Sequence, residues 1–184
     1  MTAALNPRQT QIAEAAIDLF LDQGVGVSTA AIAKAAGVSN GTLFNAFPTK
    51  QHLIDAIYLT TKRDFFDALA LKDGEPFNRA SVRRLWDAHL AWSRAAPNRH
   101  KIKRLLLEAG LASADAQQQA DEMGLAHAAW MAKAHTAGVI RGPNIQFISE
   151  LTFFHIDLVI DQSLTGADEA LAFDMLCNAI GLHE

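Results

Sequence analysis

The side chains best suited to recognition chemistry in this sequence lie between residues 28 and 50. They are mainly hydroxyls and amides, followed by one lysine: Ser28, Thr29, Ser39, Asn40, Thr42, Asn45 and Lys50. Hydroxyls, lysine and backbone N–H groups bind phosphates, and an amide side chain can pair with the edge of an adenine. The segment is therefore better suited to binding a nucleic acid than to catalysis.

Residues that could catalyse a reaction or bind a metal are scattered along the chain. The seven histidines form no His-x-x-x-His pair, and Cys177 is the only cysteine. A zinc site or a metal-dependent enzyme needs such ligands at short, regular spacings. The sequence also has no phosphate-binding loop and no dinucleotide fingerprint. We therefore expect no catalytic residue, no metal site and no cofactor, and we expect that the chain is not an enzyme.

The polar segment itself predicts two short helices joined by a glycine turn. Ser28 and Ser39 are suitable N-caps, since each hydroxyl can accept from a free N–H of a first helical turn. Gly37 stands where a helix can end in the left-handed conformation. Pro48 stops the second helix, and Thr49 can cap a third that opens at Lys50. This is a helix-turn-helix arrangement, with the second helix short and polar enough to enter a groove.

The rest of the chain predicts an all-α fold. Apolar residues recur at helical spacing over residues 7–23, 49–71, 78–96, 99–111, 114–137 and 145–164, and in a last helix that has Asp168 and Glu169 in its first turn. No segment alternates as a strand would. The 184 residues are 50% apolar and 20% charged, as in a globular protein. The single cysteine, the lack of a signal peptide pattern and the lack of a long apolar run predict a cytoplasmic protein that does not span a membrane.

Three motifs in fixed order suggest a family. They are Leu19-Phe20 before Gly24, the run Ile32-Ala33-Lys34-Ala35-Ala36-Gly37-Val38-Ser39, and Gly41-Thr42-Leu43-Phe44 followed by Phe47 and Lys50. On these motifs, residues 8–54 closely resemble the N-terminal domain of the TetR (tetracycline-repressor) family of bacterial regulators. The resemblance covers about a quarter of the chain. It implies an N-terminal three-helix DNA-binding domain followed by a helical bundle that binds a small molecule and forms a dimer.

These observations lead to one main interpretation. Residues 8–54 are predicted to be a DNA-binding domain, with residues 28–47 as its reader, and residues 55–184 to be a helical effector-binding and dimerisation domain. The predicted DNA contacts are Thr29, Ser39, Asn40, Gly41, Thr42, Phe44, Asn45 and Lys50. The expected function is a ligand-responsive transcriptional regulator, most simply a repressor that binds a palindromic operator in double-stranded DNA.

Two departures from the family pattern favour an alternative. Phe44 stands where the family usually has Tyr, and Ala46 stands where His or Tyr is usual. Both changes remove groups that could bind the DNA backbone, and the chain has a formal net charge of -4. We expect weaker DNA binding for these reasons. The alternative is a helical small-molecule-binding or interaction protein whose DNA reader has been weakened.

The C-terminal part predicts a ligand pocket and a dimer interface. Pockets between helices are mainly apolar with a few polar groups, and the candidate lining residues are Trp86, His89, Trp92, His127, Trp130, Met131 and His155. Their mixture predicts a largely apolar small-molecule effector. Residues 145–164 and the terminal helix are apolar nearly all round, which indicates burial on more than one side. We therefore expect a homodimer formed through the last two helices.

Overall fold

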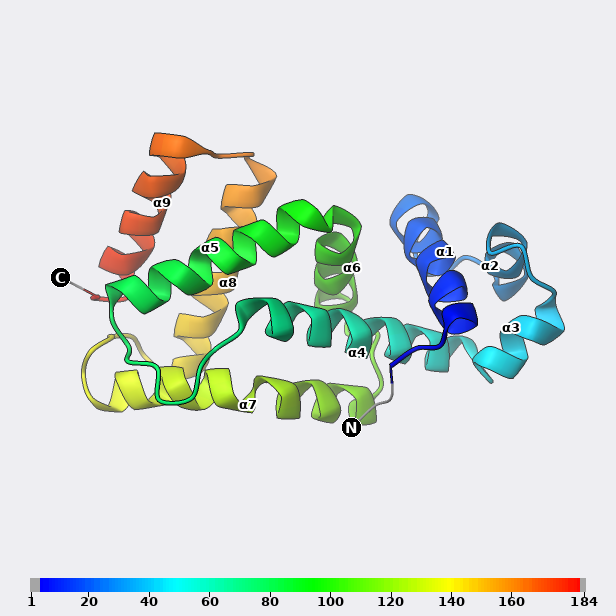
Figure 1. Cartoon of the computed structure of the whole chain (residues 1–184), viewed down its shortest axis with the longest axis horizontal. Helices are drawn as coiled ribbons and strands as arrows, with labels where there is room; N and C mark the ends of the chain where they lie inside the picture. The colour runs from blue at the N-terminus through cyan, green and yellow to red at the C-terminus, as the bar shows by residue number, and fades with distance from the viewer. Residues whose placement is uncertain (1–3, 183–184) are drawn as a thin grey trace. The chain divides into compact units, whose positions relative to one another are not determined.

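The computed structural model describes residues 4–182, and all regular structure in that part of the chain is helical (Figure 1). The helices are α1 (Pro7–Gln23), α2 (Thr29–Ala35), α3 (Asn40–Ala46), α4 (Lys50–Leu69), α5 (Arg79–Ala95), α6 (Pro97–Glu108), α7 (Ala114–Thr136), α8 (Ile145–Asp161) and α9 (Gly166–Ala179). The all-α prediction is confirmed, and the observed helix ends lie within a turn of the predicted ones. None of the helices in the described part is long and apolar enough to cross a bilayer.

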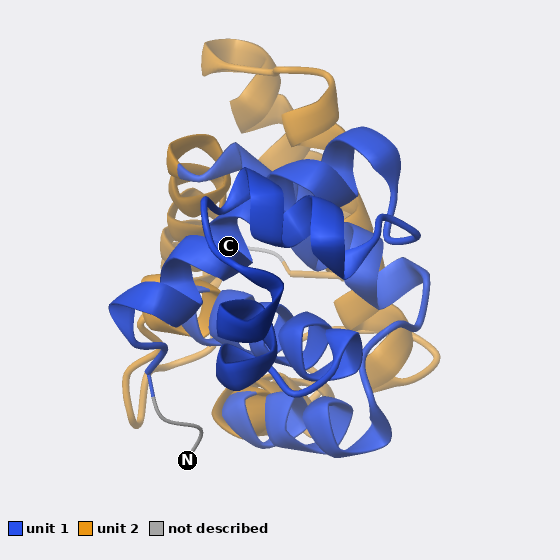
Figure 2. Cartoon of the chain, turned by 90° about the vertical axis from the view of Figure 1, so that its right-hand side faces the viewer, with its two compact units in different colours: residues 1–64, 96–123 blue, residues 65–95, 124–184 orange. Residues whose placement is uncertain are grey.

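The chain forms two compact units, which Figure 2 draws in two colours. Unit 1 comprises the chain up to Asp64 together with Ala96–Met123, and unit 2 comprises Phe65–Ala95 together with the chain from Gly124 onward. The helices α4 and α7 contribute residues to both units. This division differs from a boundary at residue 54 because α6 packs against α1 and so joins the first unit. A functional boundary at residue 54 stays a prediction.

The core of unit 1 is built from one apolar stripe on each of its first helices. Ile12 and Phe20 from α1 pack with Ile32 from α2, Leu43 from α3 and Leu53 from α4, and none of the five is more than 1% exposed. Complete burial of such a side chain stabilises a fold by about 1.5–3 kcal/mol. This shared core fixes the two short helices α2 and α3, which are too short to be stable alone.

The ends of α2 and α3 follow the predicted caps. The Ser28 Oγ accepts from the Ala31 N–H at 3.2 Å, and the Ser39 Oγ accepts from the Thr42 N–H at 3.1 Å. Gly37 has a φ of +65°, a conformation that costs glycine little. The chain therefore turns between α2 and α3 without strain.

The core of unit 2 forms where α5, α8 and α9 meet. Trp86 and Leu90 from α5, Ile156 from α8, and Phe173 and Leu176 from α9 are all at most 4% exposed. Ion pairs join α5 to α9 at the edge of this core, for example Arg79 to Asp174 at 2.5 Å and Arg94 to Glu169 at 2.6 Å. Met131 and Ala134, from the part of α7 that belongs to unit 2, also pack into this core.

Candidate functional site

The predicted helix-turn-helix is present in unit 1, with α3 as its second helix (Figure 1). The apolar side of α3 is buried through Leu43, while Ser39, Asn40, Gly41, Phe44 and Asn45 are exposed. The exposed fraction of Phe44 is 44%, which is high for a large apolar side chain. The outer face of α3 therefore presents two amides, a hydroxyl and one aromatic ring to solvent.

Two predicted contact residues, Thr29 and Thr42, are half-buried. The Thr42 Oγ1 lies 2.9 Å from the Ser39 Oγ, so these two hydroxyls form a hydrogen bond at the start of α3. Thr29 is the first residue of α2. Both threonines therefore stand at helix N-termini, where unpaired N–H groups and the helix dipole favour a phosphate.

Two glutamines of α1 brace the reader, a feature that sequence reasoning missed. The Gln11 Nε2 donates to the Ala36 carbonyl at 2.8 Å, at the end of α2. The Gln9 Nε2 donates to the Ala46 carbonyl at 3.2 Å, at the end of α3. A helix leaves its last carbonyls without partners, so these amides satisfy groups that would otherwise need water. The partners are 25 and 37 residues apart in the chain, and no local pattern announces them.

Lys50 has partners within its own unit. Its Nζ donates to the carbonyls of Val25 at 2.5 Å and Val27 at 2.6 Å, and it lies 5.8 Å from the centre of the Phe20 ring. The ammonium thus ties the first turn of α4 to the loop before α2. The prediction that Lys50 binds a phosphate is not tested by this geometry and stays a prediction.

The segment from Gly37 to Gly41 also fits the Gly-x-Ser-x-Gly pattern that surrounds the nucleophile of many hydrolases. In those enzymes the serine stands between a strand and a helix. Here Ser39 lies between two helices, and its Oγ is the N-cap of α3. The serine therefore has a structural partner and a place in the fold that differ from those of a hydrolase nucleophile.

Unit 2 contains an apolar cavity of about 50 Å³ between α5, α7 and α8. Five of the seven predicted ligand-pocket residues line it: Trp86, His89, His127, Trp130 and Met131. The other two lie elsewhere. Trp92 packs on Phe65, with ring centres 5.2 Å apart, and the His155 Nε2 lies 2.8 Å from the Ala172 carbonyl oxygen.

The cavity wall also includes residues that sequence reasoning did not select. They are apolar or small polar residues from several helices and from the loop before α5: Leu69, Phe77, Val82, Leu85, Ser149, Thr152, Phe153, Ile156, Leu176 and Ile180. None of the described lining residues is Asp, Glu, Lys or Arg. Burial lowers the pKa of His127 below its usual range, so the imidazole is neutral at pH 7. The described cavity wall therefore carries no permanently charged side chain.

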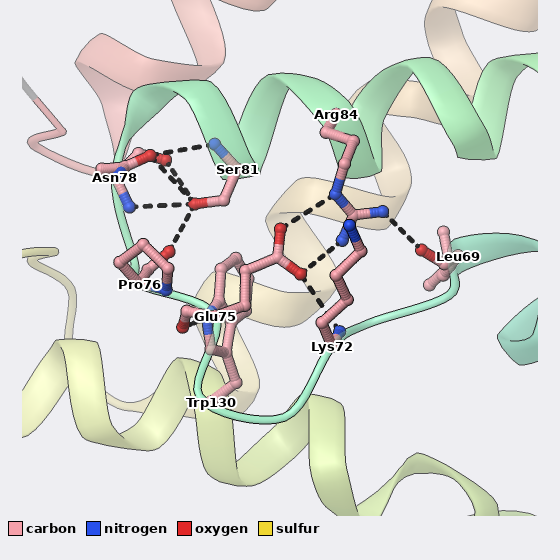
Figure 3. Close-up of polar contacts among 8 residues, drawn as sticks. All are labelled: Leu69, Lys72, Glu75, Pro76, Asn78, Ser81, Arg84 and Trp130. Atoms are coloured by element: carbon pink, nitrogen blue, oxygen red, sulfur yellow. Dashed lines mark hydrogen bonds and ion pairs between the residues drawn. The ribbon is translucent and has the colours of Figure 1, made fainter.

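The loop between α4 and α5, residues 70–78, crosses one side of the cavity and is here called the strap. Figure 3 shows that Arg84 forms two hydrogen bonds to the Glu75 carboxylate, at 2.9 and 2.6 Å, and a third to the Leu69 carbonyl. These bonds hold the pKa of Glu75 below its usual range. The Trp130 Nε1 donates to the Glu75 carbonyl at 2.9 Å, which fixes the strap on α7.

The strap and residues of α7 also line a wide groove of about 730 Å³. Phe77 and Trp130 line both the groove and the cavity, and their ring centres are 4.2 Å apart. These two rings therefore separate the buried cavity from an open surface groove.

The outer surfaces of α8 and α9 carry exposed apolar side chains. On α8 they are Phe147, Phe154 and Leu158, with exposed fractions of 50%, 72% and 46%. On α9, Leu171 and Met175 are 59% and 56% exposed. The exposed side chains recur at helical spacing on each helix, and apolar side chains gathered on one exposed face mark an interaction site more often than single scattered ones do.

Comparison with known proteins finds a matching family model and several solved structures of similar fold. Residues 12–57 match the family model for bacterial regulatory proteins of the tetR family. A tetR family transcription regulator from Shewanella sp. PV-4 is 25% identical, with a TM-score of 0.82 over 95% of this chain and 98% of that chain. A TetR family regulator from Marinobacter aquaeolei VT8 is 20% identical, with a TM-score of 0.79 over 94% of this chain and 95% of that one.

A third solved structure is the multidrug binding protein EbrR complexed with imidazole. It is 20% identical to this chain, with a TM-score of 0.66 over 97% of this chain and 98% of that one. The matched segment 12–57 contains α2, α3 and the first turns of α4, the same segment on which the sequence motifs lie. Residues 12–57 therefore match the tetR family of bacterial regulatory proteins, and nearly the whole chain has the fold of solved TetR family transcription regulators.

Proposed function

We propose that this chain is a ligand-responsive repressor, which binds a palindromic operator as a homodimer and is released by a largely apolar small molecule. The exposed polar face of α3 carries the DNA-binding part of this proposal. Asn40 and Asn45 are exposed and have the chemistry to pair with base edges in a major groove. Thr29, Ser39, Gly41 and Thr42 stand at the helix N-termini that favour phosphates.

The exposed apolar surfaces of α8 and α9 support the homodimer. A face that carries Phe154 at 72% exposure is costly for an isolated protomer and is covered when two copies pair. A symmetric pair would present two readers related by a two-fold axis. Such readers match a palindrome with half-sites one or more helical turns apart.

The cavity in unit 2 supports the response to a ligand. A ligand can shift a conformational equilibrium only if it binds one of the two conformations more tightly. Leu69, the last residue of α4, lines the cavity, and the same helix begins at Lys50 beside the reader. A ligand that displaces Leu69 would therefore act on the helix to which the reader is fixed.

One of the similar structures, the multidrug binding protein EbrR, is complexed with imidazole. A small molecule bound to a protein of this fold is consistent with the proposal. The alternative, a helical binding protein with a weakened reader, differs in one measurable respect. It predicts no preference of the protein for its own operator over unrelated DNA.

A DNA titration of the purified protein tests the proposal. The probe is the DNA upstream of its own gene, labelled and followed by fluorescence anisotropy at two salt concentrations with unlabelled competitor. The matched control is Asn45→Asp, since the exposed Asn45 keeps its shape while it gains a charge that phosphates repel. Saturable, competitor-resistant binding by the native chain and its loss in Asn45→Asp are expected. Equal binding to competitor at both salts would favour the weakened-reader alternative.

A further inference from the structure

Some polar groups on the cavity wall have a hydrogen-bond partner within the protein, and others do not. The Trp130 Nε1 donates to the Glu75 carbonyl at 2.9 Å, and the Thr152 Oγ1 donates to the Ile148 carbonyl at 2.8 Å. The Ser149 hydroxyl points at the Met131 sulfur, 3.6 Å away. These three groups are used within the protein and are not free to recognise a ligand.

Two other wall residues carry buried polar atoms that have no hydrogen-bond partner in the described part of the chain. They are the indole Nε1 of Trp86 and the Nδ1 of His127. Trp86 is only 2% exposed, so bulk solvent does not reach its N–H. A buried donor without a partner costs about 1–3 kcal/mol, and native proteins leave few such groups. An indole N–H is a donor only, so its missing partner must be an acceptor.

The charge of the lining and the volume of the cavity limit the charge and the size of the ligand. The described lining has no Asp, Glu, Lys or Arg, and transfer of an isolated ion into such a site is strongly unfavourable. The void of about 50 Å³ is also about a third of the roughly 150 Å³ apolar cavity that holds benzene in an engineered protein. A ligand must therefore widen the cavity, and Met131 on its wall is an adaptable side chain.

We propose that the cavity takes an uncharged, mainly apolar ligand with a hydrogen-bond acceptor, and that the indole N–H of Trp86 is the donor that selects it. A ketone, ester or ether oxygen would satisfy this donor. The inference rests on the proposed function in that it assigns the ligand class of the same cavity. Its chemistry, however, concerns binding alone and does not depend on DNA.

Four planar probes of nearly equal shape test the proposal. Acetophenone carries the acceptor, α-methylstyrene replaces the carbonyl oxygen with a methylene group, benzoate is the anion and benzamidinium is the cation. Affinities are measured by calorimetry on the full chain without DNA. We expect acetophenone to bind about fivefold more tightly than α-methylstyrene, the size of one neutral hydrogen bond. We expect both ions to bind at least about tenfold more weakly than acetophenone.

The variant Trp86→Phe removes the indole N–H and keeps an aromatic ring. It should weaken acetophenone binding about fivefold and change α-methylstyrene binding by less than about twofold. A second readout does not require the variant to fold. In the native protein, acetophenone should move the Trp86 indole N–H resonance downfield, whereas α-methylstyrene should not. That resonance is assigned by elimination with Trp92→Phe and Trp130→Phe.

Several results would overturn the proposal. They are equal affinity for acetophenone and α-methylstyrene, an ion that binds as well as acetophenone, no shift of the Trp86 resonance, or no binding of any probe up to millimolar concentration. Failure of the proposed function gives a different result. If acetophenone binds through Trp86 but leaves operator affinity unchanged, the ligand class stands and the release mechanism does not.

Discussion

The side chains of the reader, residues 28–47, and its neighbours fall into two groups. Asn40, Phe44 and Asn45 are exposed, so their substitution changes what the surface of α3 can bind. Gln11 and Lys50 instead donate hydrogen bonds to backbone carbonyls, and these bonds hold the helices in place. The first group should affect recognition, and the second should affect stability and, through it, binding to every DNA sequence.

Phe44→Tyr should strengthen DNA binding. Phe44 is 44% exposed on α3, so a hydroxyl added to its ring would reach solvent or a DNA phosphate without disturbing the core. One added hydrogen bond to a charged oxygen is worth about 1.5 kcal/mol or more, roughly a tenfold gain in affinity. The gain should be similar for all operator variants, because phosphates carry no sequence information. Anisotropy titrations measure it, and an unchanged affinity would place the ring away from the DNA backbone.

Lys50→Met should destabilise the native protein by about 1–2 kcal/mol, since the half-buried ammonium makes two charge-assisted hydrogen bonds to Val25 and Val27. Urea denaturation measures this change. Lys34→Met is the matched control, because Lys34 is an exposed cation of α2. If Lys50 only positions the loop, the salt dependence of DNA binding stays as in the native chain. A slope reduced by about one per protomer would instead establish the predicted phosphate contact.

Among the connecting elements, the strap is held to α5 and α7 by polar bonds to Glu75 and by bonds between Ser81 and Pro76 and Asn78. Glu75 accepts two hydrogen bonds from Arg84 through its side chain and one from Trp130 through its backbone. The strap also contributes Phe77, one of the two rings between the cavity and the open groove. Loss of the hydrogen bonds to Glu75 should therefore make the Phe77 ring more mobile.

Glu75→Gln should lower the free energy of unfolding by about 1 kcal/mol at pH 7. Arg84 depresses the pKa of Glu75 in the folded state, so the stabilisation is present above the unfolded pKa and is lost as the pH falls through the folded pKa. The difference between native and variant should thus shrink below about pH 4. Asp73→Asn in the same loop is the control, since Asp73 is exposed. A difference that persists in acid would contradict the ionic origin.

The elements that could be predicted are those whose signals are local. Ser28, Gly37 and Ser39 each act on neighbours within a few residues, and their caps and turn are observed as predicted. The brace from Gln9 to the Ala46 carbonyl spans 37 residues and depends on how α1 crosses α3. The cavity was only partly predictable for the same reason. Helical spacing selected Trp86 and His127, whereas Phe77 reaches the wall from a loop that has no period.

For the whole molecule, the exposed apolar side chains of α8 and α9 are unfavourable in an isolated chain. Phe154 and Leu171, at 72% and 59% exposure, belong to different helices that pack on each other in unit 2. Interfaces of stable homodimers are more apolar than ordinary protein surface. In the proposed homodimer, and not in the single chain, these side chains are expected to be buried.

Phe154→Glu should convert the protein to a monomer and abolish tight operator binding, because a charge buried in an apolar interface is strongly unfavourable. Sedimentation velocity and an anisotropy titration measure the two effects. Leu125→Glu is the matched control, since Leu125 is 62% exposed on α7 and lies outside the predicted interface. If the Phe154 variant sediments as the native protein does, the dimer uses another surface.

The apolar cavity has a further consequence for the response of the protein to hydrostatic pressure. An internal void is eliminated when a chain unfolds, and pressure favours the state of smaller volume. The void of about 50 Å³ corresponds to about 30 mL/mol, which is within the usual range of unfolding volumes. A ligand that fills the void removes this contribution, so the occupied protein should unfold at a higher pressure than the empty one.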